Sequence, residues 1–200
     1  RCYEKGIGCK ADFVMAFNLL KEAMSSQNKD VLVKLGVYYV NVEQNQEKAI
    51  ELWEQAAEGE NGHPFAKNLL AEHYTKEFKT IGNKELAKKI IAYHKQAADH
   101  PSGAGWKSAY RLNAICVKVR TALLRRDSYN ELHAFIADRD KMRFLDQTYI
   151  DSIIFILAED FPAKGDAAFS RDQLTARIDQ ISEKYSNCDN RYISQHDALL

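Results

Sequence analysis

The chain has 200 residues with 28 Lys and Arg, 28 Asp and Glu, and a formal net charge of zero at pH 7. This balance excludes a protein whose whole surface binds nucleic acid or acidic membranes, because such proteins carry a broad excess of basic residues. The hydrophobic share of 46% predicts a folded chain. No apolar run approaches the roughly 20 residues that a membrane span requires. We therefore expect neither a nucleic-acid partner nor membrane insertion.

The sequence predicts an all-α fold. Its 9 glycines and 3 prolines fall mostly between segments with helical apolar periodicity, and strand or hairpin signals are nearly absent. Asp12 and Asn83 are the expected N-caps of two helices. In chain order, we expect helices at about 12–25, 30–40, 45–58, from 64 past 74, and then at 83–98, 105–124, 128–140, 149–157 and 170–185.

A short motif recurs three times in the first hundred residues. The string LLKEA at 19–23 is followed by LWEQAA at 52–57 and by YHKQAA at 93–98. Each copy comes after a tyrosine, and these tyrosines lie 36 and 35 residues apart: Tyr3, Tyr39 and Tyr74. Recurrence at a period of this length indicates stacked helix pairs.

The first two copies resemble the Sel1-like repeat, a helix pair related to the tetratricopeptide repeat (TPR). Its pattern runs A-x-x-x-L-G-x-x-Y-x-x-G-x-G-V-x-x-D and then A-x-x-W/Y-x-x-x-A-A-x-x-G. The first copy matches with Tyr3, Gly6, Gly8 and Asp12, and the second with Leu35, Gly36, Tyr39, Ala49, Trp53 and Ala56. In the third copy Ile90 stands in place of the first alanine, and an insertion around 79–83 replaces the glycine loop.

This resemblance implies an α–α superhelix of antiparallel helix pairs, a TPR-like solenoid. Repeats would occupy residues 1–103, with the first repeat truncated, and a degenerate or non-repeat helical extension at 104–200 would pack on the same stack. Physics supports the repeat pattern, because small residues let helix axes approach while large rings fill the space between them. The expected packing residues are Gly36, Tyr39, Ala49, Trp53 and Ala56.

Catalytic, cofactor and metal motifs are missing from the sequence. It has no GxSxG, P-loop, GxGxxG after a strand, or HExxH. Cys2 and Cys9 lack the CxxC spacing of a zinc knuckle, and His94 takes the position of Trp53 in the repeat, which predicts a packing or partly exposed residue rather than a metal ligand. We expect no catalytic residues, no cofactor and no metal.

The four cysteines leave the cellular compartment open. They permit two disulfides in three connectivities, and a short bridge between Cys2 and Cys9 would close the loop that contains Gly6 and Gly8. Of the two compartments, we expect the extracytoplasmic, periplasmic one that an oxidised chain predicts; the alternative is a cytoplasmic protein with four reduced thiols.

Charge is distributed unevenly along the chain. Residues 43–60 hold six acids and one lysine, with Glu47, Glu51, Glu54 and Glu58 on one helix face, while 86–126 hold nine basic residues and one acid. The acidic segment and the basic segment are explained equally well as solvent-exposed helix faces. Alternatively, the basic helix lines a concave groove that binds an acidic protein or peptide through aromatic and basic anchors: Tyr74, Trp106, Lys107, Tyr110, Arg111 and Lys118.

The predicted function is a non-catalytic protein–protein interaction protein, a scaffold or adaptor that binds its partner in the concave groove. The resemblance implies this role and a bacterial, often exported, protein. A first alternative is an immunity protein that neutralises a secreted bacterial toxin. A second is a ligand-binding or enzymatic C-terminal part, whose aromatic residues include Phe155 and Tyr185. Nucleic-acid binding through the basic helix ranks last, because the run is short and flanked by acids.

Overall fold

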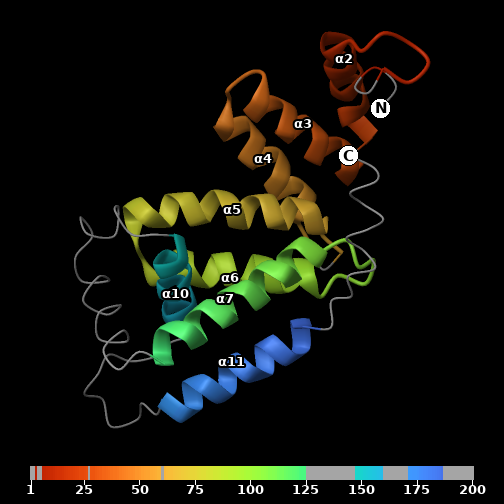
Figure 1. The fold of residues 1–200 in the computed structure, drawn as a ribbon. Coiled ribbons are helices and arrows are strands. Elements are labelled where there is room, and N and C mark those ends of the chain that lie inside the picture. Colours follow the sequence, from red (N-terminus) through yellow and green to blue (C-terminus); the bar gives the residue numbers. More distant parts are fainter. Residues whose placement is uncertain are drawn as a thin grey trace. The chain divides into compact units, whose positions relative to one another are not determined.

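The computed structural model describes residues 3, 6–26, 28–59, 61–124, 147–159 and 171–186. All regular elements in these ranges are helices, and the fold is all-α with packed helix pairs, as predicted (Figure 1). The helices are α2 (Phe13–Ala23), α3 (Lys29–Asn41), α4 (Gln46–Ala57), α5 (Pro64–Ile81), α6 (Lys84–Ala98), α7 (Trp106–Leu124), α10 (Gln147–Ala158) and α11 (Arg171–Ser186), with a 3-10 turn at Met24–Ser26.

The chain divides into two compact units, Arg1–Leu70 and Ala71–Leu200, and the division falls inside α5. The predicted repeat boundary at 103 lies elsewhere, within the second unit, and it stays a prediction. The predicted helix at 128–140 lies outside the described residues. Within the described ranges, no helix combines the length and the apolar character needed to cross a membrane.

Short polar side chains start the helices of both units. Asp12, Asn45 and Asn83 each accept a hydrogen bond from the backbone N–H three residues on, at 3.0, 3.0 and 2.7 Å. This satisfies one of the N–H groups that a helix leaves without an internal partner. At the start of α5 the capping side chain is His63, whose Nδ1 accepts from the N–H groups of Phe65 and Ala66. The expected caps Asp12 and Asn83 are confirmed.

Gly36 and Trp53 form the central contact of the first unit. The indole of Trp53 lies against the backbone of α3 at Gly36, where an added Cβ would clash with the indole nitrogen and lie 2.7 Å from Cδ1. The indole N–H donates to the carbonyl oxygen of Val33 at 3.3 Å, so the ring is buried with its polar atom paired. Ala49 and Ala56 are fully buried beside it on α4. Tyr39 is half-buried and meets the ring of Phe17 edge-on at 5.5 Å.

The corresponding positions of the second unit carry a different pair. Ala71 stands where the repeat has Gly36, and His94 stands where it has Trp53; both are buried. The ring of His94 is smaller than that of Trp53, and Ala71 is larger than Gly36. His94 is 1% exposed, and its Nδ1 lies 3.3 Å from Oγ of Ser108 on α7. The predicted packing role of His94 agrees with this burial.

Helix α10 is the most buried element of the second unit. Its side chains from Ile150 to Ile156 are all buried, including Asp151 and Ser152. It packs on both α6 and α7, while α11 packs along α7. Helix α5 also continues two turns beyond Tyr74, which buries Phe78 completely. The predicted apolar helix at 149–157 is confirmed.

We expect Gly36→Ala to destabilise the chain, although glycine to alanine normally favours a helix. The new Cβ has no room beside Trp53, and such overpacking costs about 1–3 kcal/mol of unfolding free energy. Helix propensity alone would give a gain of about 1 kcal/mol. Chemical denaturation of the wild type and of Gly36→Ala measures whether the unfolding free energy falls or rises.

The matched control is Gly36→Ala combined with Trp53→His, which recreates the residue pair of the second unit. We expect this double variant to recover part of the loss, because the smaller ring leaves space for the Cβ. A Gly36→Ala protein that is more stable than the wild type would contradict the close contact.

Candidate functional site

Five of the six predicted partner-binding residues lie on helix α7. Lys107 and Tyr110 are exposed, Tyr110 by 66%, and Trp106 is half-buried with the Lys107 ammonium 5.5 Å from its ring centroid. Arg111 and Lys118 are about a third exposed, at 32% and 30%. The structure therefore places a solvent-accessible aromatic and basic set along α7.

Tyr74, the sixth predicted residue, lies on α5 and is only 7% exposed. Its ring stacks on Tyr93 with the centroids 6.1 Å apart, and the ammonium of Lys89 lies 4.0 Å above it. The same ammonium donates to the Tyr74 hydroxyl at 2.7 Å. Tyr74 therefore ties α5 to α6 and offers little surface to a partner.

Arg111 and Lys118 both bind one buried carboxylate. The Nη2 atom of Arg111 lies 2.6 Å from Oδ1 of Asp151, and Nζ of Lys118 lies 3.1 Å from Oδ2. Asp151 is 1% exposed in the centre of α10, where an unpaired charge would be very unfavourable. Both predicted partner-binding cations therefore act as counter-ions inside the unit, and the three groups together retain a single positive charge.

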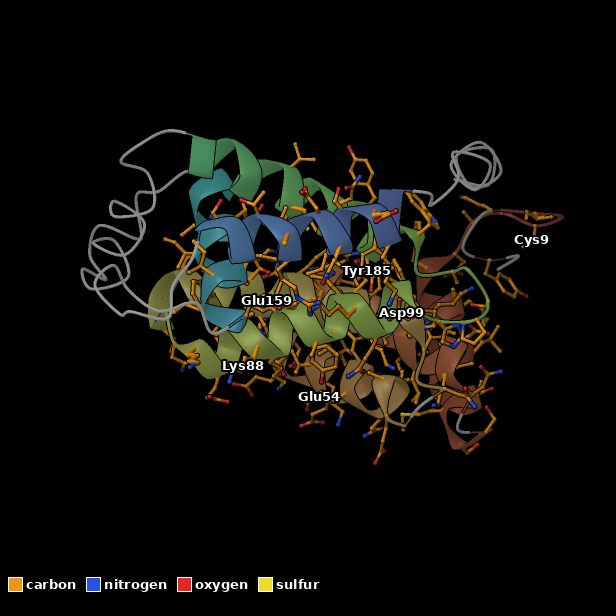
Figure 2. All side chains as sticks on the ribbon, turned by 90° about the horizontal axis from the view of Figure 1, so that it is seen from below. Cys9, Glu54, Lys88, Asp99, Glu159 and Tyr185 are labelled. Carbon is orange, nitrogen blue, oxygen red and sulfur yellow. The ribbon has the colours of Figure 1, made fainter. Side chains whose placement is uncertain are left out.

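A second acid, Glu159, joins three helices. Its carboxylate accepts from Lys95 on α6 at 2.5 Å and from Arg177 on α11 at 2.9 Å (Figure 2). Burial raises the pKa of Glu159, but the hydrogen bonds from Lys95 and Arg177 outweigh burial and hold the pKa below its usual value. Glu159 is therefore a charged junction between α6, α10 and α11.

A third acid, Asp99, caps the end of α6 and holds the end of α11. It accepts from Lys184 at 2.7 Å and from the hydroxyl of Tyr185 at 3.0 Å. The hydrogen bond to Asp99 raises the pKa of Lys184, and burial raises the pKa of Tyr185. Sequence reasoning missed all three acidic junctions. The available signal was the opposite net charge of neighbouring segments, +8 for 86–126 and −6 for 127–200.

Nothing in the described part of the chain resembles a metal centre, because it contains no group of three or more His, Cys, Asp or Glu that could hold an ion. His94 faces Ser108, and His100 Nδ1 lies 2.7 Å from Oγ of Ser102. Burial, with the nearby charge of Arg111, lowers the pKa of His94 to about 3. His94 is therefore neutral at physiological pH and serves the core.

No disulfide joins the two described cysteines, Cys9 and Cys116. Cys9 is exposed in its glycine loop, whereas Cys2 lies outside the described residues, so the Cys2–Cys9 bridge stays a prediction. Cys116 is fully buried on α7, and burial raises the pKa of its thiol to about 11. A thiol of this kind is a poor nucleophile and behaves as a small apolar side chain.

Comparison with known proteins gives one family. The Sel1 repeat matches residues 1–27 and 33–61, the two copies in which the repeat pattern is most complete. No curated protein and no solved structure matches the chain.

The pairing of Asp151 can be tested with charge-free variants. Arg111→Met with Lys118→Met leaves the buried carboxylate without its two cations from α7, which costs about 3–5 kcal/mol of unfolding free energy. Adding Asp151→Asn to this double variant should recover much of that loss, since no charge then remains to be compensated. Lys107→Met, an exposed change on the same helix, should shift stability by less than about 0.5 kcal/mol. Equal losses in the double variant and in Lys107→Met would contradict the ion pairs.

His94 gives a pH dependence of defined sign. The folded-state pKa of about 3 lies below the ordinary 6.5, so the unfolded chain takes up a proton in this window and the folded chain does not. Stability is therefore lost as the pH falls from 6.5 toward 3. His94→Gln removes this contribution, so its unfolding free energy should fall less steeply, by up to about 1.4 kcal/mol per pH unit. Parallel slopes for both proteins in denaturant titrations at several pH values would refute this assignment.

Proposed function

We infer that this chain, which carries Sel1-like repeats at residues 1–27 and 33–61, is a protein-interaction protein without catalytic activity, a scaffold or adaptor. The observation that carries the inference is the pair of matched repeats within a fold of packed helix pairs, because Sel1 repeats are generally protein–protein interaction modules. Stacked pairs of this type present extended surfaces to partners.

The surface that we propose for the partner is the outward side of α7. Tyr110 is the most exposed aromatic residue of the predicted set, and Lys107 and the half-buried Trp106 lie beside it. Tyrosine, tryptophan and arginine contribute most often to binding energy at interfaces. An acidic partner suits Lys107 and the single net positive charge of Arg111, Lys118 and Asp151. Since those two cations already bind Asp151, Tyr110 should contribute more to affinity than either of them.

An extracytoplasmic, periplasmic location is part of the proposal and depends on the predicted Cys2–Cys9 bridge. An immunity protein, the more specific role, would form a tight one-to-one complex with one toxic protein. A ligand-binding C-terminal part has less support, because two of its aromatic residues, Phe155 and Tyr185, are buried in the helix packing.

The experiment is capture of partners from a native extract by the wild type and by Tyr110→Ala, followed by mass spectrometry and measurement of the affinity for the captured protein. Loss of an exposed anchor should weaken binding by at least about tenfold, which corresponds to about 1.4 kcal/mol. Lys76→Ala, an exposed change on α5, is the control and should leave affinity unchanged. Equal binding by all three proteins would remove α7 as the interface, and a single stoichiometric partner would favour the immunity role.

A further inference from the structure

Helix α11 lies on the outside of the second unit (Figure 1) and packs along α7 through a narrow set of buried side chains. Among its described side chains at 175–185, only Ile178, Ile181 and Tyr185 are buried. They follow one another at three and four residues, so they form a single narrow stripe along the helix. By contrast, α10 buries seven consecutive side chains. Helix α10 is thus part of the core, whereas α11 covers it from one side.

The polar contacts of α11 reach three different elements beneath it. Arg177 binds Glu159 after the end of α10 at 2.9 Å, Ser182 donates to Asn113 on α7 at 2.9 Å, and Lys184 binds Asp99 at the end of α6 at 2.7 Å. Figure 2 shows Glu159 and Asp99 at separate points along α11, with Tyr185 near Asp99. Each of these contacts joins two side chains, so each can be made equally well by a side chain of another helix.

Together these contacts define a binding groove and the helix that it prefers. The surface beneath α11 has a carboxylate toward each end, Glu159 and Asp99, and takes apolar side chains between them. Arg177 and Lys184 are seven residues apart, so they lie on one side of the helix, along the edge of the buried stripe. The matching ligand is an amphipathic helix with two basic residues seven positions apart and apolar residues between them.

We propose that α11 is a displaceable latch over this groove, and that the groove binds an amphipathic helix of this basic kind from a partner protein. The inference does not depend on the α7 surface proposed above. Because α11 is tethered to its groove, it competes at high effective concentration. A partner therefore binds with an affinity reduced by the fraction of molecules whose latch is open.

Cys116 reports latch opening in the intact chain. Its thiol is fully buried on α7 and feels the charges of Glu159, Lys95 and Arg177, the cluster that ties α11 in place. Labelling with iodoacetamide, followed residue by residue by mass spectrometry, should modify the buried Cys116 slowly in the native protein and rapidly in the unfolded one. We expect a labelling rate for Cys116 that changes little at low denaturant, because opening of one helix exposes much less surface than unfolding of the whole chain.

Two variants separate latch opening from global unfolding. Ile181→Ala removes a buried side chain of the latch and should raise the native labelling rate of Cys116 about 30-fold or more. Phe78→Leu weakens the core on α5 and should lower global stability without changing that rate. If Cys116 is labelled only with the denaturant dependence of global unfolding in all three proteins, α11 is an integral part of the core and the latch is refuted.

The groove itself is tested with a fluorescent peptide of residues 171–186. It should bind the full-length Ile181→Ala protein at least about tenfold more tightly than the wild type, whose own latch competes. A peptide with Arg177→Glu and Lys184→Glu is the matched control, and it should bind at least about tenfold more weakly, because like charges then face Glu159 and Asp99. Equal binding of both peptides, or no binding to the variant whose Cys116 labels rapidly, would overturn the groove.

Discussion

A carboxylate in the middle of an apolar helix determines how the second unit is organised. Asp151 lies on α10 among buried isoleucines, and a charge in such a place must be compensated within hydrogen-bond distance. Two cations from α7 meet this requirement, which sets the rotation of α10 against α7. Glu159, eight residues later, extends the same arrangement to α6 and α11. Two of the four basic residues of α7, Arg111 and Lys118, are therefore the complement of an acid that follows them in the chain.

The sequence predicted the elements of this fold better than their polar contacts. Asp12 and Asn83 indicate helix starts in the sequence, because the side-chain oxygen of an N-cap residue accepts from a backbone N–H only three residues away. The packing roles of Gly36 and Trp53 could be anticipated because both match positions of the Sel1-like repeat pattern. The destination of Arg111 and Lys118 could not, since a cation on a helix face gives no sign whether its partner lies forty residues on or in another protein. The role of Tyr74 was missed for a related reason, because Lys89 and Tyr93, which cover it, reach it only once α5 and α6 are paired.

The two surfaces that we propose for partners lie in different parts of the second unit and differ in charge. The outward side of α7 offers an exposed tyrosine and a modest positive charge. The groove beneath α11 offers two carboxylates and an apolar strip, so it would select a partner of opposite sign. A scaffold with two surfaces of unlike charge can hold two unlike partners at once. A partner binds in the groove only after α11 has left it.

The Gly36–Trp53 contact and its counterpart, Ala71 with His94, bear on how such repeats can diverge. A repeat that begins with glycine and tryptophan cannot acquire alanine first, because that intermediate is overpacked, whereas a smaller ring first leaves only a void. The order of substitutions is therefore constrained, and ring reduction must come before the gain of a methyl group. The second unit has the composition expected at the end of such a path. The same constraint holds for the reverse exchange, so either pair is converted into the other by way of glycine with histidine.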